Sequence, residues 1–355
     1  MAAQSRRVNS LTLKRPDDWH VHLRDGAALA AVAKFTAERF GRAIVMPNLK
    51  PAVTTTEMAR AYRQRILAAL PAQTRFEPLM TLYLTDATDP GEIDRAMKSG
   101  SVHGVKYYPA GATTHSDAGV TDIRRTYPAL ARMQEVGMRL LVHGETPRAD
   151  VDVFDRETHF LDAVLIPLIE RFPKLKVVFE HISTARAAEF VAGARPGIAA
   201  TITPQHLLHN RNAIFSGGIR PHYYCLPVLK RERDREALVA AATGGNPRFF
   251  LGTDSAPHTR ASKENACGCA GMFTAHGGIE LYAEVFEAAG CLDRLQPFAS
   301  HFGADFYGLP RHEDTITLIK EPWTAPASLD FGDGTLVPYR AGETIGWRLA
   351  PAKEA

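Results

Sequence analysis

The chain has 355 residues, of which 45% are hydrophobic and 23% charged, so it can bury a sizeable core without disulfides. Its formal net charge is only +3 and no block of lysines and arginines stands out, so nothing indicates binding to nucleic acid or to an anionic membrane. The sequence shows neither an apolar signal-peptide core near its start nor an apolar run of membrane-spanning length, and we therefore expect a soluble, cytoplasmic protein.

Short apolar runs alternate with longer amphipathic segments from Asp17 to about Gly303. The apolar runs predict eight strands, at residues 17–22, 42–46, 78–83, 103–107, 138–143, 176–181, 198–203 and 249–254. Helical patterns lie between them, at residues 27–40, 56–70, 89–98, 123–136, 158–171, 184–193 and 231–243. Strands separated by helices of this length predict right-handed crossovers and a parallel sheet.

Eight such units is the number that closes an α/β barrel of the (β/α)8, or TIM, type. Periodicity alone also allows a doubly wound open sheet. The sequence after the first strand disfavours that alternative, because it reads His22-Leu-Arg-Asp-Gly26 and not GxGxxG. We predict a catalytic barrel over residues 1–309 and a short C-terminal extension over residues 310–355 that packs on it, with extended segments at 315–320 and 336–339.

Polar side chains end five of the predicted strands, which is where barrel enzymes carry their catalytic groups. They are His20, His22, Lys106, His143, His181 and Asp254. His20 and His22 lie two residues apart on one strand, so both imidazoles face the same way and can reach one ion at the short distances that zinc prefers. His143 and His181 end successive strands. Either one alone would be interpreted as a core histidine, but the pair fits two metal ligands.

The other two strand-end groups each have two interpretations. Asp254 is either the N-cap of the next turn or a metal ligand and proton carrier, and the nearby histidines favour the second role. Lys106 as an ammonium would be repelled by two metal ions. A deprotonated lysine can instead add carbon dioxide, and the resulting anionic carbamate has two oxygens that could bridge two ions. The alternative for Lys106 is an ordinary salt-bridged lysine.

The sequence resembles the dihydroorotases of the amidohydrolase superfamily, and most closely their single-function bacterial type. The resemblance rests on several long motifs in one order, from the first strand to Gly271. They are Asp18-Trp-His-Val-His-Leu-Arg-Asp-Gly26, Met46-Pro-Asn48, Gly104-Val-Lys-Tyr-Tyr-Pro-Ala-Gly-Ala-Thr-Thr114, Leu141-Val-His-Gly-Glu145, Phe179-Glu-His-Ile-Ser-Thr184, Thr203-Pro-Gln-His-Leu207 and Gly252-Thr-Asp-Ser-Ala-Pro-His258. No metal position departs from the family pattern.

The resemblance implies two zinc ions per subunit, bridged by N6-carboxylated Lys106 and a hydroxide. His20, His22 and Asp254 would hold the first ion. His143 and His181 would hold the second. The resemblance also implies the residues that bind the substrate: Arg24, Asn48 and His258 on its carboxylate, Leu226 and Ala270 on its ring through backbone groups, and Thr113 and Thr114 in a loop that closes over it. A homodimer is the family expectation.

The activity implied is the reversible hydrolysis of L-dihydroorotate to N-carbamoyl-L-aspartate, the third step of pyrimidine biosynthesis. Three rivals stay open: another cyclic-amide hydrolase such as a dihydropyrimidinase, a catalytically silent relative, and a mononuclear deaminase on the same fold. The anion-binding group of Arg24, Asn48 and His258 disfavours the first rival, because a dihydropyrimidinase substrate carries no carboxylate. The complete ligand set disfavours the second, and the deaminase would not need a carboxylated lysine. His/Asp sites also accept manganese, cobalt or nickel.

Three other groups of residues are given no catalytic role. We interpret His206 and His209 as a solvent-facing helix pair, because the metal set is complete without them. We interpret Trp19 as a packing residue beneath the metals. The four cysteines are expected to be reduced thiols; they are Cys225, Cys267, Cys269 and Cys291.

Overall fold

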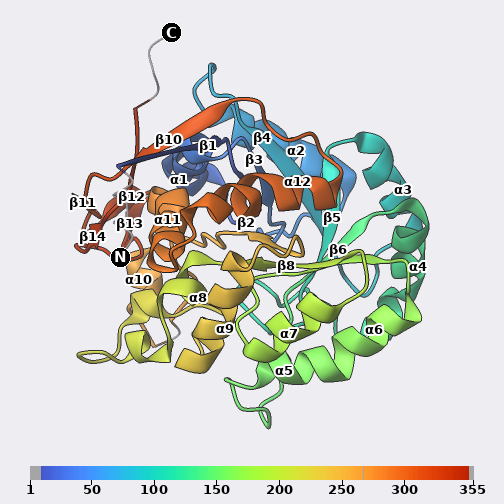
Figure 1. Cartoon of the computed structure of the whole chain (residues 1–355). Helices are drawn as coiled ribbons and strands as arrows, with labels where there is room; N and C mark the ends of the chain where they lie inside the picture. The colour runs from blue at the N-terminus through green and yellow to red at the C-terminus, as the bar shows by residue number, and fades with distance from the viewer. Residues whose placement is uncertain (1–8, 267, 352–355) are drawn as a thin grey trace.

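The computed structural model of the chain describes residues 9–266 and 268–351. Eight parallel strands form one sheet in sequence order, enclosed by helices (Figure 1). The strands are β2 (Asp17–Val21), β3 (Arg42–Val45), β4 (Glu77–Tyr83), β5 (Val102–Tyr107), β6 (Arg139–Val142), β7 (Lys176–Phe179), β8 (Ile198–Ile202) and β9 (Phe249–Leu251). The sheet closes where the amide of Asp254 donates to the carbonyl of His20 (2.9 Å) and that of His22 to Ser255 (3.0 Å). The predicted barrel and its eight strands are confirmed.

The helices follow the strands as the hydrophobic pattern predicts, and side-chain caps begin several of them. Asp25, Thr55 and Thr184 each accept a hydrogen bond from an amide of the first turn that follows. The helices are α1 (Gly26–Arg39), α2 (Thr56–Ala68), α3 (Pro90–Ser99), α4 (Tyr127–Val136), α5 (Arg156–Phe160), α6 (Ile166–Arg171), α7 (Ala185–Gly193), α8 (Pro204–Leu208), α9 (Glu232–Thr243), α10 (Arg260–Lys263), α11 (Gly278–Ala288) and α12 (Phe302–Tyr307).

The helix predicted over residues 158–171 consists of three pieces. A π-helical turn, η2 (Leu161–Leu165), separates α5 from α6. Pro167 lies just beyond that turn, and a proline cannot donate the amide hydrogen bond that would continue a regular α-helix. The other short turns are η1 (Ile123–Thr126), η3 (Arg211–Ile214), η4 (Pro221–Tyr223), η5 (Ala275–Gly277), η6 (Leu292–Arg294) and η7 (Pro297–His301).

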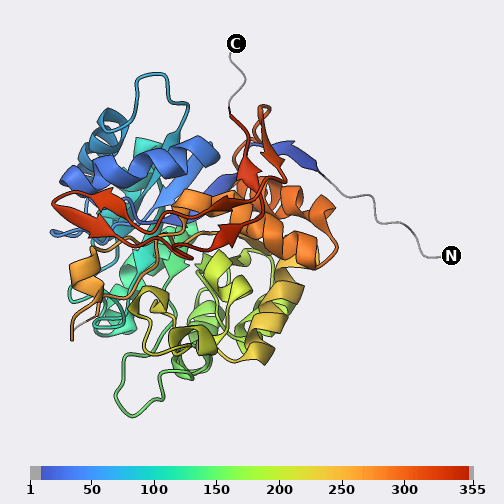
Figure 2. The same cartoon turned by 90° about the vertical axis from the view of Figure 1, so that its left-hand side faces the viewer.

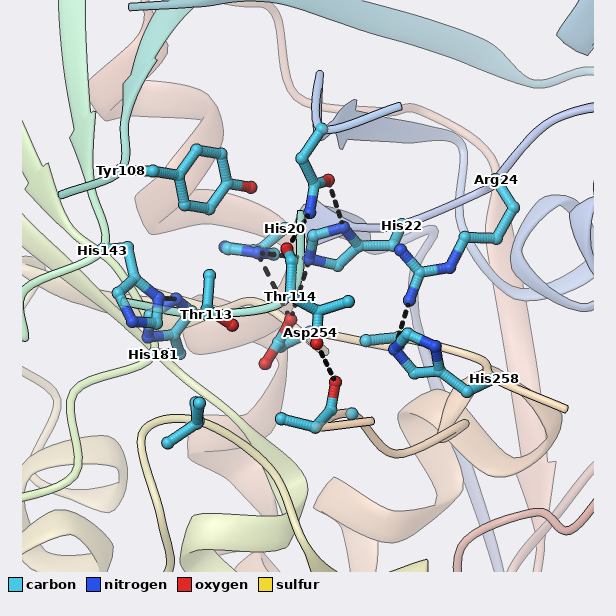
Figure 3. A pocket seen from close by; sticks show the side chains of 15 residues that line it. His20, His22, Arg24, Tyr108, Thr113, Thr114, His143, His181, Asp254 and His258 are labelled. Carbon is cyan, nitrogen blue, oxygen red and sulfur yellow. Dashed lines mark hydrogen bonds and ion pairs between the residues drawn. The ribbon is translucent and has the colours of Figure 1, made fainter. Parts of the chain in front are cut away.

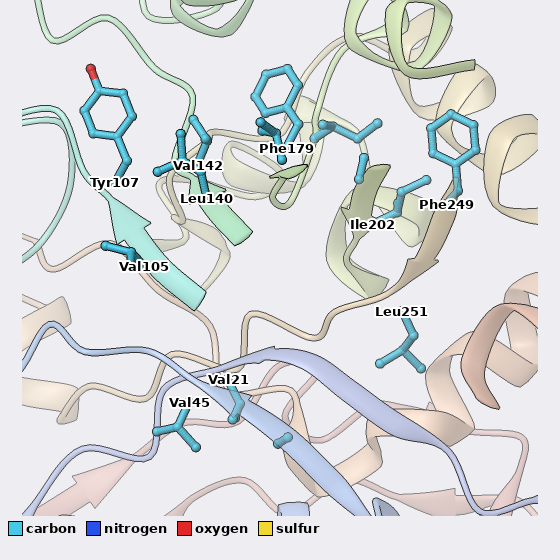
Figure 4. Packing of buried hydrophobic residues seen from close by; sticks show 14 of the residues in the cluster. Val21, Val45, Val105, Tyr107, Leu140, Val142, Phe179, Ile202, Phe249 and Leu251 are labelled. Atoms are coloured by element: carbon cyan, nitrogen blue, oxygen red, sulfur yellow. The ribbon is translucent and has the colours of Figure 1, made fainter. Parts of the chain in front are cut away.

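Alternation along the strands separates two hydrophobic clusters. In β6, Leu140 and Val142 point outward to the surrounding helices, as Figure 4 shows for this layer, while Leu141 belongs to the cluster inside the barrel. Likewise in β9, Phe249 points outward and Phe250 inward. The side chains that continue the inward rows beyond the apolar positions are the ones that reach the barrel mouth.

The bottom of the barrel interior is filled by aromatic rings. Trp19 is 1% exposed and stacks on Tyr307 of α12 with ring centroids 4.5 Å apart, and it meets Phe250 edge-on at 6.1 Å. α12 can approach this closely because Gly303 has no side chain: a Cβ there would lie 2.0 Å from Trp19 Nε1. The interpretation of Trp19 as a packing residue is confirmed.

The C-terminal region adds short antiparallel sheets to the barrel. β10 (Thr315–Ile319) pairs with both β1 (Ser10–Lys14) and β15 (Arg348–Leu349), so segments from the two ends of the chain share one sheet. β11 (Trp323–Thr324) pairs with β14 (Thr344–Ile345), and β12 (Leu329–Phe331) with β13 (Gly334–Leu336). Figure 2 shows the β12–β13 hairpin over α1.

The extended segment predicted at residues 336–339 is only partly right. β13 begins at Gly334 and ends at Leu336, so the strand stops where the predicted segment begins. Pro338 has no amide to donate to a strand partner, and the amide of Tyr339 donates instead to the carbonyl of Phe273 at 2.9 Å. Among the described residues, no helix is both long and apolar enough to cross a membrane.

Candidate active site

A pocket lies at the C-terminal ends of the barrel strands (Figure 3). Its lining consists of His20, His22, Arg24, Asn48, Tyr108, Thr113, Thr114, His143, His181, Leu226, Asp254, Ala256, His258, Ala270 and Gly271. The structure therefore brings together all the residues that the sequence analysis selected except Lys106. That lysine is fully buried on β5 and lies outside the lining.

The first group of candidate ligands comes from the two strands that close the barrel. His20 Nε2 and His22 Nε2 lie 3.3 Å apart, and Asp254 Oδ1 lies 3.4 Å from the first and 3.2 Å from the second. All three side chains are buried. Two imidazole nitrogens and one carboxylate oxygen directed at a common point form a donor set that suits zinc and related divalent ions.

The second group adjoins the first. His143 Nδ1 lies 3.3 Å from His181 Nε2, and the His181 ring lies 4.9 Å from both the His143 and the His20 rings, centroid to centroid. The four imidazoles thus form one continuous row across the pocket floor. Burial lowers the pKa of His20 and of His181 well below the ordinary histidine value, and it lowers that of His22 as well. Neutral imidazole is the form that binds metals.

Two acceptors behind the row determine which nitrogen faces the pocket. Asn48 Oδ1 lies 2.8 Å from His22 Nδ1, which leaves His22 Nε2 free to face Asp254. Glu145 Oε2 lies 3.0 Å from His143 Nε2, which leaves Nδ1 facing inward. Such partners orient ligand imidazoles and fix their tautomers. Glu145 was not singled out from the sequence, although it ends the Leu141-Val-His-Gly-Glu motif.

Lys106 lies beneath the two groups of ligands. Its amino group contacts the carboxyl group of Glu180, whose Oε2 is also 3.2 Å from His20 Nδ1. Its Nζ is 4.9 Å from the centroid of the Tyr108 ring. Complete burial lowers the pKa of Lys106 well below the ordinary lysine value. Burial therefore favours the neutral amine, which is the form that can add carbon dioxide. Glu180 is a second residue that the sequence reasoning did not select.

Three of the candidate ligand and anion-binding residues have left-handed backbone conformations that residues other than glycine seldom adopt. The φ angle is 60° at Arg24, 42° at His181 and 44° at Asp254. Each follows the end of a barrel strand, so the unusual turn redirects a side chain into the mouth. Tyr62 holds one of these turns by donating its hydroxyl to the carbonyl of Arg24 at 2.6 Å. Strain concentrated in this way is typical of functional sites.

The opposite side of the pocket carries a cationic pair. Arg24 Nη2 lies 3.1 Å from His258 Nε2, and Arg24 Nε donates to the carbonyl of Pro257 at 2.9 Å. Burial, followed by the charge of Arg24, lowers the pKa of His258. A neutral His258 can accept from the guanidinium at Nε2, and its ring also interacts with the backbone of Ala270. The pair offers a planar cation to a carboxylate at a fixed distance from the histidine row.

The remaining predicted contacts lie on the surrounding loops. Asn48 Nδ2 donates to the carbonyl of Thr114, and Thr114 Oγ1 to that of Ala270, both at 3.4 Å. The loop is internally braced, because the amide of Thr113 donates to Ser116 Oγ at 2.9 Å. Leu226 also lines the pocket.

The interpretation of two histidines outside the set needs correction. His206 is only 2% exposed and is not solvent-facing: it lies 2.7 Å from Thr203 Oγ1 and 3.0 Å from the carbonyl of Pro227. The segment after Tyr223 covers this face of α8, which local periodicity does not reveal. His209 packs edge-on against Tyr223. Of the cysteines, Cys225, Cys269 and Cys291 are free, and Cys267 lies outside the described residues.

Comparison with known proteins agrees with the barrel fold. The model of the amidohydrolase family matches residues 18–326. The chain therefore belongs to the amidohydrolase family, a class of barrel hydrolases. Curated relatives include the dihydroorotases of Cupriavidus pinatubonensis, 68% identical over 341 residues, and Methylobacillus flagellatus, 66% identical over 342 residues; each match covers 96% of this chain and 99% of the relative. Within the family, the chain belongs to the dihydroorotases, cyclic amidohydrolases of pyrimidine biosynthesis.

Solved structures give the same result. The dihydroorotase of Campylobacter jejuni has a TM-score of 0.89 at 35% identity, with 98% of this chain and 99% of that chain covered. The Saccharomyces cerevisiae dihydroorotase in complex with 5-fluoroorotic acid has a TM-score of 0.88 at 34% identity, with 97% and 100% covered. An L-hydantoinase from Arthrobacter aurescens, at 15% identity and a TM-score of 0.80, shares the fold.

Proposed function

We propose that the chain hydrolyses L-dihydroorotate reversibly to N-carbamoyl-L-aspartate with two zinc ions. The observation that carries the proposal is the juxtaposition of two kinds of group in one pocket: a row of buried imidazoles with Asp254, and the Arg24–His258 pair. The first suits a metal-dependent hydrolase. The second suits a substrate that bears a carboxylate.

The residues present fit two ions. His20, His22 and Asp254 would hold one, His143 and His181 the other, and N6-carboxylated Lys106 would contact both. When bound, the ions supply a hydroxide at neutral pH and polarise the ring amide carbonyl. The burial of Lys106 supports carboxylation, because it favours the neutral amine.

The protein's own residues would bind and orient the substrate. Arg24, Asn48 and His258 hold its carboxylate, and the backbones of Leu226 and Ala270 hold its ring. Thr113 and Thr114 close over the ring and exclude water. In the hydrolytic direction, Asp254 accepts the proton of the attacking water and passes it to the leaving ring nitrogen. Cyclisation uses the same groups, with Asp254 protonated first.

The test is ring opening of L-dihydroorotate by the purified enzyme, before and after treatment with a chelator, with dihydrouracil as the control substrate. We expect activity on dihydroorotate alone, lost on chelation and restored by zinc. Activity that survives complete metal removal would refute the metal chemistry. Activity on dihydrouracil instead would refute the role assigned to Arg24, Asn48 and His258. We also propose that the protein is cytoplasmic and forms a homodimer. Sedimentation of the purified protein measures the oligomeric state directly.

A further inference from the structure

Lys263 is a buried lysine that does not line the pocket. It is the last residue of α10 and is 4% exposed. Its ammonium donates to three backbone carbonyls, those of Tyr224 at 3.0 Å, Cys269 at 2.9 Å and Gly271 at 2.6 Å. The three hydrogens of an ammonium group are therefore all used. Burial lowers the pKa of Lys263 to about 8, so the group is still mainly protonated at neutral pH.

The three carbonyls belong to the two segments that form one wall of the pocket. Leu226 lies two residues after Tyr224, and Ala270 lies between Cys269 and Gly271. Both Leu226 and Ala270 line the pocket. The segments also bond directly to each other, because the amide of Gly271 donates to the carbonyl of Tyr224 at 3.0 Å. One buried cation thus joins the two pieces of chain at the point where each reaches the site.

The ammonium also determines which way the Ala270 peptide faces. The carbonyls on either side of Ala270 are turned toward Lys263. The carbonyl of Ala270 is turned the other way, to Thr114 Oγ1 at 3.4 Å, and it also interacts with the ring of His258. Gly271 permits this path, because its φ is 147° and a Cβ there would lie 2.4 Å from the carbonyl oxygen of Ala256. Without the cation, the carbonyls of Cys269 and Gly271 would both lose this donor, and that of Gly271 is buried.

We propose that Lys263 is a positioning residue for substrate binding: its ammonium fixes segments 224–226 and 269–271 so that the peptide groups of Leu226 and Ala270 face the substrate ring. This inference rests on the proposed contacts of those two residues with substrate. It assigns Lys263 no contact with substrate or metal. Its effect is therefore on the binding of dihydroorotate and not on the metal ligands, which lie on other segments of the chain.

The variant that tests this is Lys263→Met, which keeps the length of the side chain and removes its three donors. We expect KM for dihydroorotate to rise about tenfold or more, because small displacements of positioning groups have large effects. We expect kcat per zinc-loaded site to change by less than about threefold, as for a loss of binding that is uniform along the reaction. Zinc content should be unchanged. Lys263→Gln retains two donors and should give an intermediate KM.

The matched control is Arg260→Met, which removes a cation from the same helix. The Arg260 side chain is 47% exposed, and its nearest carboxylate, on Glu264, lies 3.9 Å away. KM should not change in this variant. A merely structural role for Lys263 predicts a lower Tm and less folded enzyme with a normal KM. A normal KM in the Lys263→Gln enzyme, which we expect to fold even if Lys263→Met does not, would overturn the proposal.

A second comparison separates this inference from the proposed function. Arg24→Met removes the proposed carboxylate ligand, so it should raise KM if the substrate occupies the pocket as proposed. A raised KM in Arg24→Met with a normal KM in both Lys263 variants refutes the positioning role alone. A normal KM in all three variants refutes the substrate site itself, and with it the inference.

Discussion

Each imidazole in the row has two nitrogens, and for His22 and His143 an acceptor behind the ring decides which one is directed at the pocket. His22 is held at Nδ1 by Asn48 and presents Nε2. His143 is held at Nε2 by Glu145 and presents Nδ1. The two proposed metal positions therefore depend on acceptors that are not themselves candidate ligands, and these acceptors are the first residues at which to test the metal site.

We expect Glu145→Gln to weaken zinc binding about 10- to 100-fold. The amide can donate to His143 Nε2 as well as accept from it, so it no longer enforces the tautomer that leaves Nδ1 free. Competition with a graded chelator measures the affinity. Glu135→Gln, at a side chain 61% exposed on α4, is the control. Equal zinc affinity in the Glu145 variant and the native enzyme would contradict the role of Glu145.

At this scale, the residues selected from the sequence come together in one pocket, Lys106 excepted, but the residues that support them were not selected. Ligand positions could be predicted because strand ends converge at one rim of a barrel, so a local pattern implies a shared site. The contact of Glu180 with Lys106 joins residues 74 apart in sequence, one on β5 and the other just after β7, with β6 between the two strands. No local sequence pattern shows that these two side chains face each other. The interpretation of His206 as solvent-facing was wrong for a related reason: what covers a short helix is decided by a segment further along the chain.

Among the elements, the loop over residues 109–119 connects the barrel rim to the opposite wall of the pocket. Thr114 bonds to both Asn48 and Ala270. We expect replacement of Thr113 and Thr114 by alanine to lower kcat while zinc content stays constant, because the loop would lose the hydroxyls that bind substrate and hold it closed. Steady-state kinetics and metal analysis on the same preparation measure both. Unchanged turnover would remove the loop from the mechanism.

The contact between α12 and the barrel floor is a second test at this scale. A Cβ at residue 303 would overlap the indole of Trp19. We therefore expect Gly303→Ala to lower the free energy of unfolding by about 1–3 kcal/mol, as overpacking of cores does. In Gly193→Ala, at the end of α7, nothing lies within 4 Å of the new Cβ, so stability should be unchanged or slightly higher. Urea unfolding compares the two, and equal stabilities would contradict the close packing.

At the scale of the whole molecule, the barrel was predictable and its attachment to the chain ends was not. Eight repeated units carry a strong periodic signal, whereas β1 pairs with β10 through contacts such as Leu13 with Ile316, at opposite ends of the sequence. Neither of these short strands has a sequence pattern that identifies the strand with which it pairs. The interruption between α5 and α6 was missed because a π-helical turn keeps the hydrophobic pattern of a helix nearly intact.

Buried neutral histidines make the stability of the whole molecule depend on pH. Burial lowers the pKa of His206 to about 4 and that of His276 to about 3, from 6.5. Between pH 6.5 and these values the unfolded chain binds protons that the folded protein does not, so the free energy of unfolding falls as the pH falls. The contribution is complete above about pH 6.5 and decreases by about 1.4 kcal/mol per pH unit for each such histidine.

The measurement is urea unfolding of the zinc-free protein at pH 7, 6 and 5. His276→Phe removes one titrating group, so it should reduce the dependence of the free energy of unfolding on pH by the contribution of one histidine. A phenylalanine ring should be accommodated there, because the imidazole already packs between Phe273 and Trp323. The same pH dependence in the variant and the native protein would show that His276 does not titrate on unfolding.

The closure of the barrel between its first and last strands also determines when the site can form. Asp254, which follows the last barrel strand, bonds through its amide to His20 on the first. During synthesis His20 and His22 therefore leave the ribosome long before their carboxylate partner exists, and nearly the whole barrel must be translated before the ring can close. A nascent or truncated chain has an incomplete set of candidate metal ligands, so hydrolytic activity should appear only in molecules that have finished folding.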